Sequence, residues 1–534
     1  MIIRRDDVEA LAEYLSLHPF RLKGPGVVQD LNGTVFPDAF EHPQQNFRFG
    51  FGAKGYGLLN LACHHGQLEM VRYLLDVSQD VAGDLKFRDG DGWTPLLAAA
   101  NAMADKSKLE KYHRGLAVAS YTGRCEEIME LLFDRGAPAD DVRECKFWRR
   151  GDRFVETGRR MQWSEGYTEE ELLAGPEALD LRPVPEDEIV TCLTDTVLSL
   201  AIRRASATMI ERLLDGGADA HLQLAPSKKT GWPELRLNMP LHIAGRYYNA
   251  AAIDILRERN GDTEFKKMIR KQDDGGETAL KLATKGGYLL CFMLPVDQIV
   301  SQGVATFSTL LRSCDPDDVD ARATTDHHTP LYAILSGLFI RRNPSRQALR
   351  ARVARMLVEH GADPALKTSN GRNALHALAS SFVNTADDQC AEYALIGPFL
   401  SRGVSVDDAD NSGDTALHVA ARDCRRPAAV RTLLRHGATP EVTNKAGYTP
   451  LHIAAAMTTA FRAEGLDFKQ VAEMQDEVMQ LLVEAASSHG GSPMERRNAS
   501  GKTLLEIKDE SRERIKKDLA PPIWSPGWER GRGR

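Results

Sequence analysis

Two stretches near the C-terminal end decide the fold: Thr415-Ala-Leu-His-Val-Ala420 and, 34 residues later, Thr449-Pro-Leu-His-Ile-Ala454. Weaker copies of this phrase begin at Gly57, Thr94, Thr196, Met239, Thr278, Thr329, Asn373 and Thr503. A second phrase follows most copies, as in Leu213-Leu-Asp-Gly-Gly-Ala-Asp219 and Leu433-Leu-Arg-His-Gly-Ala438. Two phrases in a fixed order, found about ten times between residues 56 and 507, predict a chain of internal repeats.

The residue types in the two phrases predict two short helices per repeat. Thr caps a helix by accepting from its free N–H groups, and Pro fits the first helical position. Leu and the small Ala residues let neighbouring helices stack closely. The second helix ends at Gly, which tolerates the left-handed conformation after a helix. Stretches such as Asp89-Gly-Asp-Gly92 have the composition of turns, so we expect a projecting hairpin between repeats.

This pair of phrases resembles the ankyrin repeat. The resemblance implies an all-α repeat solenoid, in which stacked helix-turn-helix units carry projecting β-hairpin loops. It also implies a non-enzymatic scaffold or adaptor that binds a protein partner through a concave groove and the hairpin tips. By the same resemblance, the recurring histidines hydrogen-bond the backbone between neighbouring repeats and are structural: His242, His376, His418 and His452.

Other residues stand at the histidine position in the weaker copies: Asn60, Leu97, Ser199, Lys281, Tyr332 and Glu506. We expect looser joints there, because the stability of a repeat array depends on the contacts between neighbours.

Irregular spacing divides the chain into five parts. Residues 1–50 read as an N-terminal cap helix and an extended segment, 51–142 as repeats, 143–191 as a charged insertion, 192–520 as repeats with a C-terminal cap, and 521–534 as a disordered basic tail. Residues 104–114 and 457–475 are expected to lengthen a helix pair, and residues 115–137 read as a repeat of their own. The predicted number of repeats is nine to eleven.

The insertion carries two blocks of opposite charge. Residues 143–160 hold seven basic and three acidic residues, with Phe147, Trp148 and Phe154 among them, and residues 165–188 hold nine acidic residues against one Arg. Aromatic and basic residues in alternation can contact nucleic acid through 143–160. Blocks of opposite charge this close can pair with each other or offer a partner a surface of both signs. The acidic neighbour favours a folded-back charged excursion whose aromatic residues pack on the solenoid.

Composition narrows the function further. The net charge is −7, which argues against a chain that binds nucleic acid or a membrane surface as a whole. The eight cysteines include no Cys-x-x-Cys pair, so we expect buried, reduced thiols in an intracellular protein, cytoplasmic or nuclear. Gly501-Lys502-Thr503 lacks the upstream glycine of a phosphate-binding loop and reads as a turn. No catalytic residue, metal, cofactor or small-molecule substrate is expected.

The candidate partner-binding residues lie just after the Ala positions or just before the capping position, where side chains point towards the groove and the tips: His64, His65, Trp93, Arg246, Tyr247, His327, His328, Arg422, Asp423 and Tyr448. Trp, Tyr and Arg most often dominate interface energy. A rival interpretation is that Trp93 and Tyr448 pack along their own hairpins. A second candidate function is a substrate-recruiting subunit of an enzyme complex, such as a ubiquitin ligase.

We predict that denaturant unfolding is not two-state, because the preserved phrases and the shortest spacing are confined to one part of the array. Residues 415–490 should be among the last to lose amide protection when hydrogen exchange is followed through the transition. A single transition that coincides by fluorescence, circular dichroism and hydrogen exchange would contradict this expectation.

Overall fold

The computed structural model describes residues 8–17, 58–78, 80–89, 92–104, 118–150, 153–156, 189–222, 239–273, 275–286, 296–324, 326–336, 344–380, 393–422, 424, 427–457, 468–488, 497–498 and 500–519. The chain divides into two compact units, Met1–Ser313 (unit 1) and Cys314–Arg534 (unit 2). The predicted tail, 521–534, and most of residues 1–50 lie outside the described residues.

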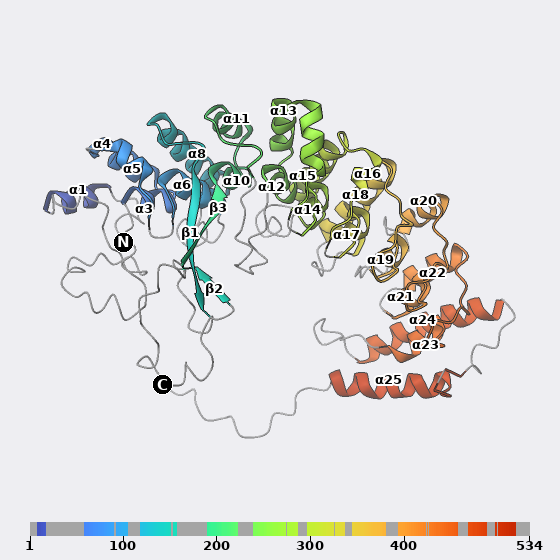
Figure 1. The fold of residues 1–534 in the computed structure, drawn as a ribbon. Coiled ribbons are helices and arrows are strands. Elements are labelled where there is room, and N and C mark those ends of the chain that lie inside the picture. The colour runs from blue at the N-terminus through green and yellow to red at the C-terminus, as the bar shows by residue number, and fades with distance from the viewer. Residues whose placement is uncertain are drawn as a thin grey trace, which may run out of the picture. The chain divides into compact units, whose positions relative to one another are not determined.

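Unit 1 consists mainly of helix pairs. The first helices of the pairs are α3 (Leu58–His64), α6 (Pro95–Ala104), α10 (Val197–Ala201), α12 (Pro240–Arg246) and α14 (Ala279–Lys285). Their second helices are α4 (Leu68–Val77), α8 (Val118–Asp134), α11 (Ala207–Asp215), α13 (Ala250–Arg270) and α15 (Val296–Leu311). Each first helix packs against the next, and the second helices form a parallel row (Figure 1). The remaining helices are α1 (Val8–Leu17), which packs on α4 at the predicted cap position, and the short α5 (Val81–Lys86).

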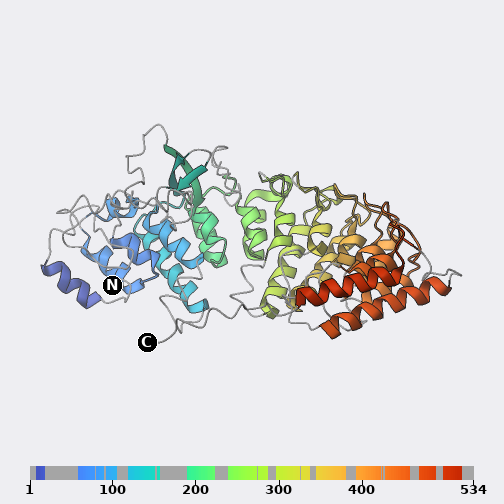
Figure 2. The same cartoon turned by 90° about the horizontal axis from the view of Figure 1, so that it is seen from below.

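Unit 2 repeats this arrangement. Its first helices are α17 (Pro330–Ser336), α19 (Ala374–Ser380), α21 (Ala416–Arg422) and α23 (Pro450–Ala456). Its second helices are α18 (Pro344–Glu359), α20 (Ile396–Ser401), α22 (Pro427–Arg435) and α24 (Phe468–Ser488), with a 3-10 turn, η5 (Tyr393–Leu395), ahead of α20 and the short α16 (Pro316–Val319) ahead of α17. The last helix, α25 (Leu504–Leu519), packs on α23 and α24 as the expected C-terminal cap (Figures 1 and 2).

The described residues thus contain nine helix pairs and the single helix α25, within the predicted range. One expectation is corrected, because residues 115–137 do not form a repeat of their own. The described part of this stretch belongs to α8, which packs against α6 as its second helix. Tyr121, Cys125, Ile128 and Leu132 recur every three or four residues along α8 and are buried, so a single apolar face holds it in place.

The charged insertion begins and ends in a sheet. β1 (Val142–Arg150) pairs antiparallel with both β2 (Arg153–Glu156) and β3 (Ile189–Thr196), which gives the strand order β2-β1-β3. The repeat phrases contained no signal for this sheet. The pairing of β1 with β3 joins the two ends of the insertion. The chain therefore leaves the helix array along β1 and returns along β3, beside β1.

Helices begin where the sequence predicted caps. The Thr196 hydroxyl accepts from the Ser199 N–H at 2.9 Å, and Thr329 accepts from the Tyr332 N–H at 3.2 Å. In the weaker copy at Asn373, the side-chain oxygen accepts from the His376 N–H at 3.2 Å. These bonds satisfy N–H groups that the helix itself leaves unpaired.

Six hairpin tips in the described residues share one five-residue turn: Asp89–Trp93, Asp273–Glu277, Thr368–Arg372, Asp410–Asp414, Asn444–Tyr448 and Asn498–Lys502. The first N–H donates to the fifth carbonyl at 2.8–3.0 Å, and the fourth residue is a glycine whose N–H donates to the first carbonyl. The φ of these glycines lies between 68° and 79°, a left-handed conformation that favours glycine. The last turn contains Gly501 and Lys502, which confirms that this stretch is a hairpin turn.

Neighbouring tips in unit 2 also bond to each other. The Asn411 N–H donates to the Asn370 carbonyl, and the Lys445 N–H donates to the Ser412 carbonyl, both at 3.0 Å. Gly413 lies in this contact, where an added Cβ would be 2.8 Å from the Lys445 nitrogen. Glycine is therefore required here for its φ of 79° and also for the close approach of the next tip.

We predict that Gly413→Ala destabilises unit 2 more than the matched substitution Gly437→Ala. Gly437 also has a positive φ, 86°, but nothing lies within 4 Å of an added Cβ, so only the backbone strain of about 1–2 kcal/mol applies. Gly413→Ala should cost about 1 kcal/mol more, because the bond between the tips must shift. Urea unfolding followed by hydrogen exchange over 415–435 measures both, and equal losses would contradict the tip contact.

Candidate functional site

One hydrogen bond recurs at several joints between repeats. The histidine Nε2 in the first helix lies next to the carbonyl oxygen of the residue just before the next repeat's capping position. The distances are 3.2 Å for His242 to Glu277, 3.0 Å for His376 to Asp414 and 3.0 Å for His418 to Tyr448. This bond links each tip to the helix before it.

The opposite ring nitrogen settles the protonation state of His418. Its Nδ1 accepts from the Thr415 backbone N–H at 3.1 Å, so in the neutral ring Nε2 carries the proton and donates to the Tyr448 carbonyl. Burial lowers the pKa of His242, His376 and His418 below the ordinary value, which keeps these rings neutral.

Asn60 takes over this role in the first repeat. Its side-chain nitrogen donates to the Trp93 carbonyl at 2.6 Å and to the Phe87 carbonyl at 3.3 Å. Trp93 precedes Thr94, so the acceptor occupies the same position as in the histidine joints. The expectation of a looser joint at Asn60 is therefore corrected, because an amide donor makes the same bond as the imidazole.

Lys281 occupies the histidine position in another repeat, where its side chain forms an ion pair. Its side chain and that of Glu277 are fully buried, with 3.7 Å between Lys281 Nζ and Glu277 Oε1. Lys285 Nζ also bonds to Glu277 Oε1. The Glu277 carboxylate thus pairs with the buried Lys281 ammonium group and with the partly exposed Lys285, and such pairing is the condition under which buried charge is tolerated.

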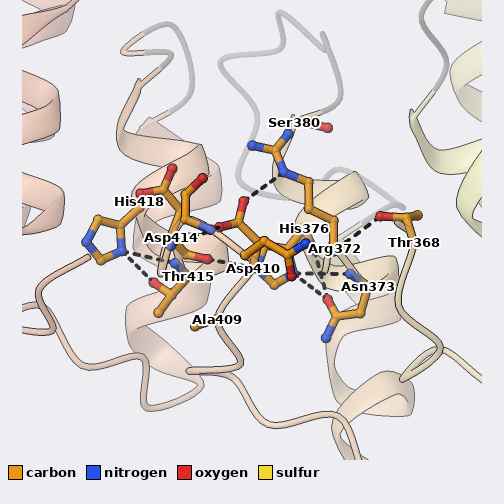
Figure 3. A network of polar contacts seen from close by, with 12 residues as sticks. Thr368, Arg372, Asn373, His376, Ser380, Ala409, Asp410, Asp414, Thr415 and His418 are labelled. Atoms are coloured by element: carbon orange, nitrogen blue, oxygen red, sulfur yellow. Dashed lines mark hydrogen bonds and ion pairs between the residues drawn. The ribbon is translucent and has the colours of Figure 1, made fainter. Parts of the chain in front are cut away.

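A polar network connects the tips of unit 2 (Figure 3). Arg372 Nε donates to Asp410 Oδ2 at 3.0 Å, and Asp410 Oδ1 accepts from the N–H groups of Ser412 and Asp414. Burial alone would raise the pKa of Asp410, but the Arg372 bond and the two N–H bonds outweigh it, and the pKa lies below its ordinary value. Asp410 is therefore a carboxylate that fixes its own tip and the preceding one.

Asp414 extends the network to the next repeat. Its Oδ2 accepts from Arg422 Nη2 at 2.5 Å, and its Oδ1 accepts from Asn444 Nδ2 at 2.8 Å. Its backbone carbonyl accepts from His376. Three successive repeats thus meet at one residue, and they hold Arg422 at the end of α21.

Unit 1 carries a row of charged and aromatic side chains across three repeats. The Arg143 guanidinium lies 4.1 Å from the Trp93 ring centroid, and its Nη1 is 3.8 Å from Asp195 Oδ2. Arg203 Nη2 is 3.1 Å from Asp195 Oδ1, and its guanidinium lies 5.6 Å from the Tyr247 ring centroid. We call these five residues the charged–aromatic row.

Three first helices and two strands bring the residues of the charged–aromatic row together. Trp93 precedes α6, Arg203 follows α10, and Tyr247 caps the end of α12, and these first helices are consecutive in the array. Arg143 and Asp195 come from β1 and β3, so the sheet inserts an ion pair between the repeats. Each arginine has an aromatic ring on one side and the Asp195 carboxylate on the other, an arrangement that orders the guanidinium planes.

A family model of the ankyrin repeat in three copies matches residues 345–444 and 382–463, and a model of the single ankyrin repeat matches residues 54–83. This chain is an ankyrin-repeat protein. Among solved structures, the human ASB11 ankyrin repeat domain is 19% identical, covers 53% of this chain and 100% of that one, and has a TM-score of 0.35. The ankyrin repeat domain of Bcl-3, described as a unique member of the IkappaB protein family, is 20% identical and covers 53% and 98%, with a TM-score of 0.33.

Ankyrin repeats are generally protein–protein interaction modules, and this ankyrin-repeat protein has an all-α repeat solenoid fold. In the described part of the chain, no helix is both long and apolar enough to cross a membrane. The same residues contain no group of three or more His, Cys, Asp and Glu side chains that could hold a metal ion.

The structure places the candidate residues of unit 1 in two environments. His65 and Trp93 are only 5% and 8% exposed, and the His64 ring packs 5.8 Å from Trp93. Arg246 is exposed and Tyr247 is half-buried, and both lie at the end of α12. Trp93 is thus buried beneath the surface, whereas Arg246 and Tyr247 are part of the surface.

The candidates of unit 2 are partly engaged with their own tips. His328 packs 4.5 Å from the Tyr332 ring, beside the exposed His327. Tyr448 lies edge-on to His452 at 6.1 Å. Arg422 pairs with Asp414, and Asp423 lies outside the described residues.

Sequence reasoning missed Arg143, Asp195 and Arg203. A signal for Asp195 and Arg203 exists, because an acid just before the capping position is followed eight residues later by a base: Asp195 and Arg203, Glu277 and Lys285, Asp414 and Arg422. All three combinations form ion pairs. No such spacing identifies Arg143, because this residue lies in the insertion and not in a repeat.

We predict that the imidazoles of His242, His376 and His418 titrate below the ordinary value of about 6.5. Because their folded-state pKa is depressed, the unfolded chain binds more protons in the acidic range. The stability from these joints is therefore present above the ordinary pKa and is lost as the pH falls from that value through the lower folded-state pKa. Hydrogen–deuterium exchange at histidine C2, followed by mass spectrometry across the acidic range, measures each midpoint. Midpoints at or above the ordinary value would contradict neutral, donating rings.

Proposed function

We propose that this ankyrin-repeat protein is a non-enzymatic scaffold or adaptor that binds a protein partner through the ends of its first helices and its hairpin tips. The observation that carries the proposal is the pair Arg246 and Tyr247 at the end of α12. Arg246 is exposed and forms no ion pair with another described residue, and Tyr247 is half-buried beside the Arg203 guanidinium. Arg and Tyr are the types of residue that commonly dominate binding energy at protein interfaces.

Three basic side chains form a row on this face. Arg203, Arg246 and Lys285 each lie seven residues after the N-cap of α10, α12 and α14, and α12 packs against both other helices. Arg203 and Lys285 pair with Asp195 and Glu277, whereas Arg246 pairs with no acid in the described part of the chain. This pattern favours a partner that places a carboxylate against Arg246.

The surroundings of Tyr247, the neighbour of Arg246, are ordered before any partner binds. The Tyr247 ring is bounded by Arg203, which is held in turn by Asp195 and, through it, by Arg143 and Trp93. A side chain that is already fixed loses less conformational entropy on binding, so more of the contact energy appears as affinity. The corresponding surface of unit 2 is less available, because Arg422 already pairs with Asp414.

We expect Arg246→Ala and Tyr247→Ala each to weaken partner binding by about 1–3 kcal/mol while thermal stability stays nearly unchanged. The partner is first identified by proximity labelling with the full chain in its native cell. Its affinity for the purified wild type and variants is then measured by calorimetry.

Arg259→Ala is the matched control, because Arg259 is an exposed arginine on α13, the second helix of the same repeat. It should bind the partner like the wild type, since an exposed ion pair such as that with Asp215 contributes little. Wild-type affinity in both Arg246→Ala and Tyr247→Ala would refute this surface, and insertion 143–191 would then be the next region to vary.

A further inference from the structure

The sheet at the root of the insertion brings two cysteines together. Cys145 lies in β1 and Cys192 in β3, and the antiparallel register pairs them directly. The register runs without interruption from Glu144 opposite Leu193 to Trp148 opposite Ile189, so the pairing does not depend on the irregularity between Val142 and Glu144. The two cysteines are 47 positions apart in the sequence, and their spacing alone gave no sign of this pairing.

Directly opposed positions in an antiparallel pair match the requirements of a disulfide closely. Their Cα atoms are about 4.5–5.5 Å apart, within the usual disulfide range of about 4.4–6.8 Å. Opposed residues also share one face of the sheet. In general the Cβ atoms of such pairs are about 4.5–5.5 Å apart, close to the range of about 3.5–4.5 Å in a disulfide.

Other cysteines of the described residues are less suited to oxidation. Cys63, Cys125 and Cys424 are buried in the helix array. Burial raises the pKa of the Cys63 thiol far above its ordinary value, which suppresses the thiolate that reacts with oxidants. Cys314 is half-buried, and no register of paired strands brings another cysteine opposite it.

We propose that Cys145 and Cys192 are a reversible redox site, oxidised by a small disulfide such as oxidised glutathione. One cysteine thiolate attacks the small disulfide, forms a mixed disulfide and releases one small thiol. The second cysteine thiolate then attacks the protein sulfur of the mixed disulfide and releases the other small thiol. The two protein thiols lose two electrons and two protons, and the small disulfide is reduced to two thiols.

The Cys145–Cys192 disulfide would join the first and the last strand of the insertion covalently. Residues 146–191 become a covalent loop, and β1 can no longer separate from β3. Arg143 lies two positions before Cys145 and Asp195 three positions after Cys192, so the same two strands carry the central ion pair of the charged–aromatic row. The disulfide itself does not depend on the proposed binding function, and its test uses no partner.

The test uses the full-length protein treated with oxidised glutathione and then alkylated. Mass spectrometry of a non-reducing digest should show one cross-linked species that contains Cys145 and Cys192, two hydrogen atoms lighter than the sum of the two reduced peptides. Dithiothreitol should return both cysteines to alkylation. Recovery of both as alkylated or singly glutathionylated peptides, with no cross-link, would overturn the proposal.

A second readout follows the covalent loop itself. Oxidised protein is cut by a glutamate-specific protease, and the products of cleavage between 157 and 188 are separated under denaturing conditions. The fragment that contains Cys145 and the fragment that contains Cys192 should stay joined without reductant and separate when reductant is added. Cys145→Ser and Cys192→Ser should each abolish the joining, whereas Cys314→Ser should behave like the wild type. Circular dichroism checks that the variants fold, and fragments of oxidised wild type that separate without reductant would refute the bond independently of any variant.

Discussion

The hydrogen bond from one first helix to the carbonyl before the next capping residue is the contact on which the rest of the array depends. A single helix pair cannot bury its apolar face, and each repeat is stabilised only by its neighbour. The side chains of His242, His376 and His418 supply this bond, and Asn60 supplies it as an amide. Any neutral donor of suitable length can make this bond, as the imidazole and the amide both show.

The surface chemistry follows from the same joints. Because each tip is fixed to the helix before it, side chains at equivalent positions of successive repeats come into register. Asp410 and Asp414 in unit 2 connect their tips through arginines and an asparagine. In unit 1 the sheet adds side chains to this row of equivalent positions. Its strands place Arg143 and Asp195 between Trp93 and Arg203. Arg246 and Tyr247 are therefore presented on an ordered support.

Sequence reasoning recovered the features that local physics determines. The capping threonines and the turn glycines follow from residues within one repeat, and the structure places them in those roles. The bond between repeats was expected from the resemblance to the ankyrin repeat, and the side chains of His242, His376 and His418 make it. Sequence reasoning could not recover features that depend on residues far apart in the chain. α8 read as a separate repeat because its partner α6 is separated from it by residues 105–117. Trp93 read as a surface candidate because Arg143, which packs over it, comes from the insertion.

We propose that a partner binds at the first-helix ends of unit 1. Amide hydrogen exchange of the full chain, with and without a purified partner, tests this binding site without any substitution. We expect added protection at residues 197–204 and 240–248, where α10 and α12 end, with little change along the second helices α11 and α13. Protection confined to the second helices, or found only in unit 2, would contradict it.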